Sequence, residues 1–299
     1  MVHVITTQVL GGNGDSPPER RRFADILISP DEESAYMTRT PTDDDNTKIK
    51  SVDASLDIVE TLTSDGPMTI TELAETLERS PSNVLAHLRT LRERGFAVKE
   101  DDQYRPGLRY YEIGNKTKGN YPLYVHGTEP ADELADDTGE YVWLMVEEQG
   151  RGYYLYKSGG EDAVESGAYT MGSRWHLNST ASGKVVLAHM DEERFDDVID
   201  THGLKSMTPN TITDREELKR ELETIREQGF ARDREESAVG IRGVAAPVRG
   251  LDGVIGTVSI SGPASRIEGE YFQEKLPRKV KETADIIRIK YNGAAAVDR

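Results

Sequence analysis

A hydrophobic repeat near residue 50 constrains the fold of this chain more than any other feature. Within residues 51–64, apolar side chains recur three or four positions apart at Val52, Leu56, Val59 and Leu62. This spacing brings side chains to one face of an α-helix, so it predicts an amphipathic helix that buries these four residues. A Gly-Pro pair just beyond the segment ends the predicted helix.

A second helix is predicted directly afterwards, in the segment TITELAETL. Either Thr69 or Thr71 suits its N-cap, because a threonine hydroxyl accepts a hydrogen bond from a free backbone N–H of the first turn. Its apolar residues again share one face, and the pattern predicts burial of Ile70, Leu73 and Leu77.

The third predicted helix spans residues 81–95. Ser80 suits the N-cap, Pro81 suits the first turn, and Gly95 suits the end of the helix. The inward-facing residues are Val84, Leu88 and Leu91. Two short strands follow, around an acidic turn, and form a β-hairpin. Three helices and a hairpin predict a winged helix-turn-helix.

The polar face of the third helix carries the candidate DNA contacts. The N-terminal half of such a helix reads base edges in the major groove, and flanking cations hold phosphates. Asn83 suits adenine and Arg89 suits guanine. His87 lies at the edge of the buried stripe and receives no role. The remaining DNA-binding candidates are Ser82, Thr90, Arg92, Lys99 and Arg105.

Charge is distributed unevenly along the chain. The formal net charge is -17, which by itself disfavours contact with phosphates. Between Arg79 and Arg109, however, seven cations stand against four anions. We interpret the global acid excess as adaptation to concentrated salt and the local basic patch as the functional signal. Winged helices also mediate protein association, so a protein-interaction module is the alternative.

Composition excludes several classes of protein. At 299 residues, the chain is expected to form two domains. It has no apolar run of the length that crosses a bilayer, no recognisable secretory signal and no cysteine. We therefore expect a cytoplasmic protein without disulfides. The six histidines are scattered, so neither a metal site nor a cofactor is expected.

Catalysis has no recognisable local signature. The segment TASGKVVL places Gly-Lys at a helix start, as a phosphate-binding loop does, but it lacks the required first glycine and the hydroxyl residue after the lysine. The alternative of a metabolite-processing enzyme, with the N-terminal module as an adaptor, therefore has no positive support.

The helix start near residue 180 admits two interpretations. Free N–H groups among small residues would let a small carboxylate approach closely. Plain capping by Asn178, Ser179 or Thr180 explains the same pattern, and spacing alone leaves both open.

Five segments are predicted along the chain. Residues 1–46 are expected to be disordered, with Met37 as a second possible start of translation. A winged helix-turn-helix is expected over 47–115 and a linker helix over 116–139, which Gly127 and Pro130 would break. A second, larger domain over 140–292 and a disordered tail over 293–299 complete the chain. Helices interspersed with hairpin-linked strands predict an α+β domain with a central antiparallel sheet.

Several ordered blocks resemble the IclR family of transcriptional regulators. They include SVDASLDIVETL to YRPGLRYYEIG, DELADDTGE, HLNSTASGKVVLAHM, GIRGVAAPV and VSISGPASR. The resemblance implies a dimer or tetramer that binds a double-stranded DNA operator, and a GAF/PAS-like sensor for a small organic acid or related metabolite. It implies effector contacts from Ala181, Ser182, Asp233, Gly243, Ser259 and Ser261.

Two positions depart from the family pattern. The family often carries an arginine where this chain has Ala86, so base contacts are expected to differ. Gly243 is smaller than the residues often found there, which predicts a roomier pocket.

Overall fold

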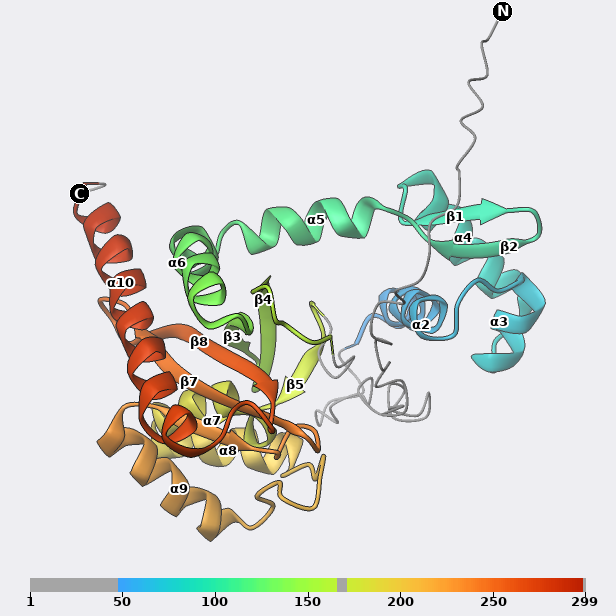
Figure 1. The fold of residues 1–299 in the computed structure, drawn as a ribbon. Coiled ribbons are helices and arrows are strands. Elements are labelled where there is room, and N and C mark those ends of the chain that lie inside the picture. Colours follow the sequence, from blue (N-terminus) through green and yellow to red (C-terminus); the bar gives the residue numbers. More distant parts are fainter. Residues whose placement is uncertain (1–47, 166–170, 298–299) are drawn as a thin grey trace, which may run out of the picture.

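A computed structural model describes residues 48–165 and 171–297 (Figure 1). The predicted disordered extension, 1–46, lies outside the described residues. In Figure 1 a small N-terminal domain and a larger C-terminal domain lie at the two ends of an extended helix, α5.

The N-terminal domain has the predicted winged helix-turn-helix architecture. Its elements are α2 (Lys50–Ser64), α3 (Ile70–Thr76), α4 (Pro81–Glu93), β1 (Ala97–Glu100) and β2 (Gln103–Pro106). The two strands pair as an antiparallel hairpin. The predicted capping is confirmed: Thr69 forms a capping box with Glu72, and Ser80 accepts a hydrogen bond from the Asn83 N–H.

The face of α2 that packs inward differs from the prediction. Ala54, Ile58 and Leu62 are buried, whereas Val52 and Leu56 are each 54% exposed. Apolar residues line two sides of this helix, so periodicity alone did not identify the buried side. The tertiary packing places the small Ala54 and Ile58 against the core. An apolar stripe of Ile49, Val52 and Leu56 is left on the surface.

Two helices join the domains. The first, α5 (Arg109–Lys118), has no buried residue, and the sequence patterns did not predict it. The second, α6 (Pro122–Thr138), runs unbroken through Pro130, so the expected break is wrong. At Gly127 the helix packs closely on the sheet: a Cβ there would lie 2.8 Å from Leu144 Cδ1. Close contact with the sheet outweighs the local preference to break.

The C-terminal domain is built on a six-stranded antiparallel sheet, as predicted. The strand order is β5-β4-β3-β8-β7-β6. The strands are β3 (Tyr141–Glu148), β4 (Arg151–Gly159), β5 (Arg174–His176), β6 (Ala231–Arg234), β7 (Ile241–Arg249) and β8 (Val254–Pro263). The short edge strand β5 was not predicted.

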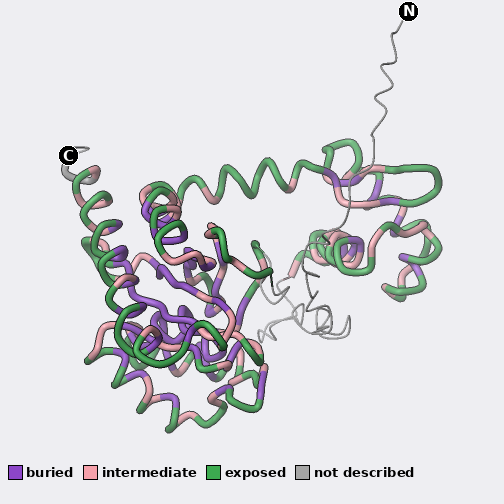
Figure 2. The backbone as a smooth tube through the Cα atoms, viewed as in Figure 1, coloured by how far each residue is buried: buried purple, intermediate pink, exposed green. Residues whose placement is uncertain are grey.

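Helices cover both faces of this sheet (Figures 1 and 2). Trp143 and Met145 of β3 pack against α7 (Ala181–Ala188), α8 (Glu192–His202) and α9 (Arg215–Gln228). Val142 and Leu144 point to the other side, toward α6 and α10 (Leu276–Val297). Alternate residues of one strand therefore belong to two separate cores.

The last helix is longer than predicted. A π-helical turn at Tyr271–Lys275 leads into α10, which continues to Val297. The expected tail from residue 293 therefore begins too early. None of the described helices is both long and apolar enough to span a membrane.

Candidate nucleic-acid interface and effector pocket

The solvent face of α4 presents the polar residues that the sequence singled out. Ser82, Asn83, Arg89, Thr90 and Arg92 are all exposed, because Val84 and Leu88 on the opposite side are fully buried. No carboxylate pairs with either arginine among the residues that the structure describes. Both guanidinium groups therefore remain available to an external anion.

The cations of the wing have partners within the hairpin. Lys99 Nζ lies 3.2 Å from Asp102 Oδ1, and Arg105 forms an ion pair with Glu100. The Arg105 guanidinium lowers the pKa of the Glu100 carboxyl. Contact with a phosphate would require Arg105 to exchange one anion for another, so the wing offers less free positive charge than its sequence suggests.

His87 has a structural position. Its Nδ1 lies 2.8 Å from the Ser55 hydroxyl of α2, so it links two helices at the edge of the core. Ala86 is exposed on the polar, solvent-facing side of α4. This side of the helix therefore has no long side chain at position 86.

One small pocket brings together all six residues predicted to contact an effector. It lies between the start of α7 and the strands β3, β4, β6, β7 and β8. The pairing register explains the convergence, since Gly243 lies opposite both Asp233 and Ser261. The pocket is lined by Trp143, Tyr154, Thr180, Ala181, Ser182, Asp233, Gly243, Ser259, Ile260 and Ser261.

Two aromatic residues of this pocket were missed by sequence reasoning. Trp143 and Tyr154 read as ordinary inward positions of alternating strands, and no local signal separates a pocket wall from a core. Their rings lie 5.2 Å apart, and Trp143 Nε1 donates a 2.9 Å hydrogen bond to the Ser261 hydroxyl. Burial raises the pKa of the Tyr154 phenol, which lies beside Thr180 and Ser182.

Gly243 allows a close approach between neighbouring strands and does not enlarge the pocket. A Cβ at this position would lie 2.7 Å from the Ile260 carbonyl oxygen of the neighbouring strand. The free space in the pocket is about 10 Å³, which is room for about one water molecule. The expected roomier pocket is not observed.

The start of α7 is capped, and part of it stays open. Thr180 Oγ1 accepts a 2.9 Å hydrogen bond from the Gly183 N–H, so Thr180 is the cap among the three candidates. Asn178 and Ser179 bond to other backbone groups. Ala181 and Ser182 lie in the first turn of α7, where backbone N–H groups have no acceptor within the helix, and both residues line the pocket.

Asp233 is the one carboxyl group in the pocket. It is 3% exposed, and its Oδ1 accepts hydrogen bonds from the N–H groups of Glu236 and Ser237. Burial, together with the nearby Glu236 carboxylate, raises the pKa of Asp233 to about 6.

A buried ion pair lies directly behind this carboxyl group. Lys184 Nζ donates hydrogen bonds of 2.6 and 2.8 Å to the two Glu236 oxygens and lies 3.2 Å from Glu221 Oε1. Lys184 is fully buried. This lysine follows Gly183, as the lysine of a phosphate-binding loop follows a glycine. Here its ammonium group binds two carboxylates instead.

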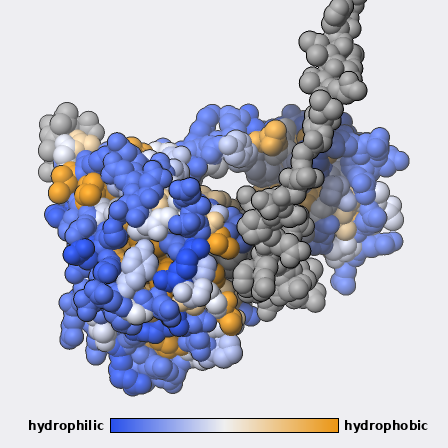
Figure 3. Space-filling model, in the orientation of Figure 1, coloured by the Kyte–Doolittle hydropathy of each residue, from blue (hydrophilic) through white to orange (hydrophobic). Residues whose placement is uncertain are grey.

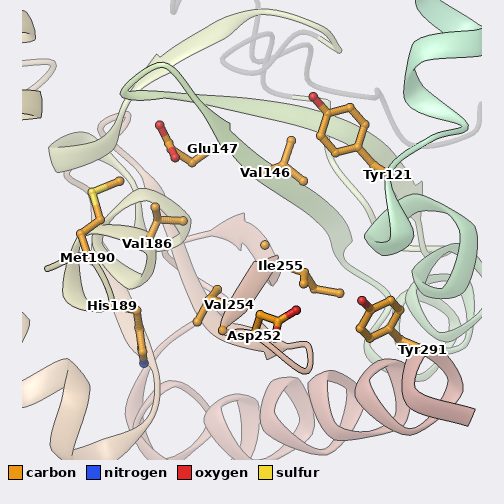
Figure 4. Close-up of a pocket in the computed structure, with 12 residues that line it drawn as sticks. Tyr121, Val146, Glu147, Val186, His189, Met190, Asp252, Val254, Ile255 and Tyr291 are labelled. Carbon is orange, nitrogen blue, oxygen red and sulfur yellow. The ribbon is translucent and has the colours of Figure 1, made fainter. Parts of the chain in front are cut away.

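A second, larger cavity lies away from the predicted site. It has a volume of about 480 Å³ and none of the six predicted residues lines it. Figure 4 shows Tyr121 and Tyr291 on one side of it and His189 and Met190 on the other. No group of three or more metal-ligating side chains occurs in the described ranges.

The titration of Asp233 makes a prediction. Its pKa in the folded chain, about 6, exceeds the ordinary value of 3.8, so the folded state holds this proton more tightly. The protonated Asp233 side chain stabilises the folded state at low pH. This contribution to the free energy of unfolding, about 3 kcal/mol, is lost as the pH rises through about 6. Asp233→Asn should therefore gain up to that amount relative to wild type between about pH 4 and pH 7. Urea unfolding at several pH values measures it.

Asp252→Asn, at an exposed position, is the matched control. Parallel stability curves for wild type and Asp233→Asn across this pH range would contradict the assignment.

Comparisons with known proteins agree with this architecture. A family model described as bacterial transcriptional regulator IclR C-terminal matches residues 123–289, and a helix-turn-helix domain model matches residues 53–100. The chain is similar to the probable HTH-type transcriptional regulator ArcR of Halobacterium salinarum. They are 32% identical over 254 residues, which cover 83% of this chain and 95% of that relative. These relatives are named as regulators, in line with the expectation of a non-enzymatic protein.

Solved structures share the fold. The crystal structure of Thermotoga maritima IclR gives a TM-score of 0.67 at 32% identity and covers 82% of this chain and 99% of that one. An IclR homologue from Microbacterium hydrocarbonoxydans, complexed with 4-hydroxybenzoate, gives 0.71 at 20% identity and covers 81% and 99%. The chain belongs to the IclR family of transcriptional regulators, with a DNA-binding helix-turn-helix and a C-terminal effector-binding domain.

Proposed function

We propose that α4 reads an operator sequence from the major groove through Ser82, Asn83 and Arg89. The observation that supports this role is the exposed polar face of α4, on which two arginines have no carboxylate partner among the described side chains. Arg92 and Thr90 flank this face and suit phosphates. Lys99 and Arg105 of the wing also suit phosphates, after their ion pairs with acidic residues of the hairpin break. A DNA-binding regulator of this kind acts in the cytoplasm.

Arg89→Ala tests the base contact. Loss of a bidentate guanine contact should weaken operator binding by about 1–3 kcal/mol and relax the preference at one base pair. Selection of bound fragments from a random DNA pool, followed by titration of the selected site, measures both effects. Arg220→Ala, an exposed arginine of the effector domain, should leave both unchanged. An unchanged sequence preference in Arg89→Ala would remove this residue from the readout.

The exposed stripe on α2 suits a second copy of the chain. Ile49, Val52 and Leu56 are 68%, 54% and 54% exposed, which is costly for three apolar side chains on one short helix. A two-fold dimer would bury this stripe in both protomers. It would also place two copies of α4 at the two halves of a pseudo-palindromic site. We include a homodimer in the proposal, with assembly to a tetramer as a further step.

Leu56→Asp tests this dimer. Burial of a leucine side chain is worth about 1.5–3 kcal/mol, and the change occurs in both protomers, so dimerisation should weaken about 100-fold or more. Sedimentation equilibrium over a dilution series measures the constant. Val239→Asp is the matched control, because Val239 is a similarly exposed apolar residue of the other domain. Equal dimerisation of both variants would exclude the α2 stripe.

We further infer that the pocket around Asp233 takes a small organic acid. The open N–H groups of Ala181 and Ser182 suit a carboxylate, and Asp233, Ser259 and Ser261 suit a hydroxyl group elsewhere on the ligand. The rings of Trp143 and Tyr154 supply an apolar wall.

Entry of such a ligand requires movement. The free space holds about one water molecule, so Trp143 or Tyr154 must shift and the bond from Trp143 to Ser261 must be exchanged. Trp143 lies two residues after the start of β3, which follows α6 directly. A ligand that favours the shifted arrangement would alter the position of α6 and, through α5, that of the DNA-binding domain.

Thermal unfolding with small carboxylic acids tests the pocket, with 4-hydroxybenzoate as the first probe. A ligand at about 100 times its Kd should stabilise the wild type by about 2.7 kcal/mol. Asp233→Ala should lose this stabilisation and retain DNA binding, whereas Asp252→Ala, which alters the larger cavity, should keep both. The reverse pattern would move the effector site to the larger cavity.

A further inference from the structure

Five basic side chains gather at one edge of the effector domain, far from α4 in the sequence. We call Arg151, Arg174, His176, His202 and Lys205 the edge cluster. It combines the start of β4, the short edge strand β5, the end of α8 and the residues that follow α8. In a chain of net charge -17, such a concentration of basic residues calls for a physical explanation.

Strand pairing brings the first three together. Arg151 lies opposite His176, and Tyr153 opposite Arg174, so these four side chains share one face of the β4–β5 pair. The intervening residues, Gly152 and Trp175, face the other side, where Trp175 joins the core beneath α7 and α8. The edge cluster is therefore separated from the effector pocket by the sheet.

The other two basic residues reach the same place around the sheet edge. His202 Nε2 lies 2.8 Å from the Gln149 carbonyl oxygen in the turn before β4. The Lys205 carbonyl oxygen accepts a 2.9 Å hydrogen bond from Asn178, two residues beyond β5. Arg151, His202 and Lys205 all act electrostatically on His176.

The Glu147 carboxylate acts on His202 of this cluster, and it also forms an ion pair with Arg194. Arg151, Arg174 and Lys205 form no ion pair among the residues that the structure describes, and the electrostatic neighbours of Arg151 are Arg174 and Tyr153. Residues 166–170, which precede β5, contain no acidic side chain either. Burial and Arg174 lower the pKa of Arg151, which means that the charged form is held at a cost.

His176 adds an unsatisfied polar atom to the cluster. Its Nδ1 is buried and has no hydrogen-bond partner among the described parts of the chain. A ring nitrogen in this state suits a ligand that accepts or donates a hydrogen bond there. Burial and the surrounding cations lower the pKa of His176 to about 3, a value that a nearby anion would raise.

We propose that the edge cluster binds a multivalent oxyanion of the phosphate type. Two guanidinium groups on one strand pair match the geometry of a tetrahedral oxyanion, which accepts several charge-assisted hydrogen bonds at once. Lys205 lies at the exposed rim and supplies further positive charge. The phosphate group comes either from a free anion or from the DNA backbone, and both sources share this chemistry.

Titration calorimetry of the full chain with inorganic phosphate tests the proposal, in potassium chloride at constant ionic strength. The double variant Arg151→Gln/Arg174→Gln should weaken phosphate binding at least tenfold. Arg220→Gln, an exposed and similarly unpaired arginine on α9, is the matched control and should bind like the wild type. Thermal unfolding without phosphate provides the second readout. The double variant should melt at or above the wild-type temperature, because it removes repulsion between like charges.

A second arm identifies the source of the phosphate group. Binding of a random-sequence DNA duplex is measured over a salt series, in which each lost phosphate contact lowers the slope by about 0.9. A smaller slope in the double variant alone assigns the site to the DNA backbone, and an unchanged slope with lost phosphate binding assigns it to a free anion. If phosphate binding and salt slope are both the same in wild type, double variant and control, the edge cluster is not an oxyanion site.

Discussion

The buried ion pair between Lys184 and Glu236 holds the effector pocket in place. Lys184 comes from the first turns of α7, and Glu236 follows β6 by two residues, so the pair fixes the helix start against the end of that strand. The Glu236 N–H also donates to Asp233, which sets the orientation of the pocket carboxyl group. Removal of one partner from a buried pair leaves an uncompensated charge and costs about 3–5 kcal/mol. The ion pair is therefore a positional constraint on the pocket.

Strand β3 connects this pocket to the rest of the molecule. Both of its faces are covered, so Trp143 cannot move without adjustment of the cores on either side. The strand begins three residues after the end of α6, and α6 leads through a short connection to the exposed α5. The structure thus offers a continuous, well-packed route from the pocket to the linker. The α5 helix between the two domains has no buried residue.

Charge is distributed unevenly over the proposed binding surfaces. The face of the molecule in Figure 3 is largely hydrophilic, and the acidic excess of the chain repels DNA. Glu100 and Asp102 pair with the cations of the wing, whereas Arg89 and Arg92 on α4 have no acidic partner in the described ranges. In the proposed operator complex, repulsion between the acidic body and DNA would favour the orientation in which α4 faces the duplex. The interpretation of the acid excess as an adaptation to concentrated salt stays a prediction.

The sequence by itself determined the local features of this protein. The N-caps at Thr69 and Ser80, the hairpin turn and the alternation of β3 depend on neighbours within a few residues, and all could be predicted from the pattern. The family resemblance also selected the six pocket residues, which the register of β6, β7 and β8 brings together. Tertiary structure alone decided which side of α2 is buried, that α6 continues through Pro130, and that Trp143 and Tyr154 form a pocket wall. Those outcomes depend on contacts between residues far apart in the chain, for which periodicity and capping carry no information.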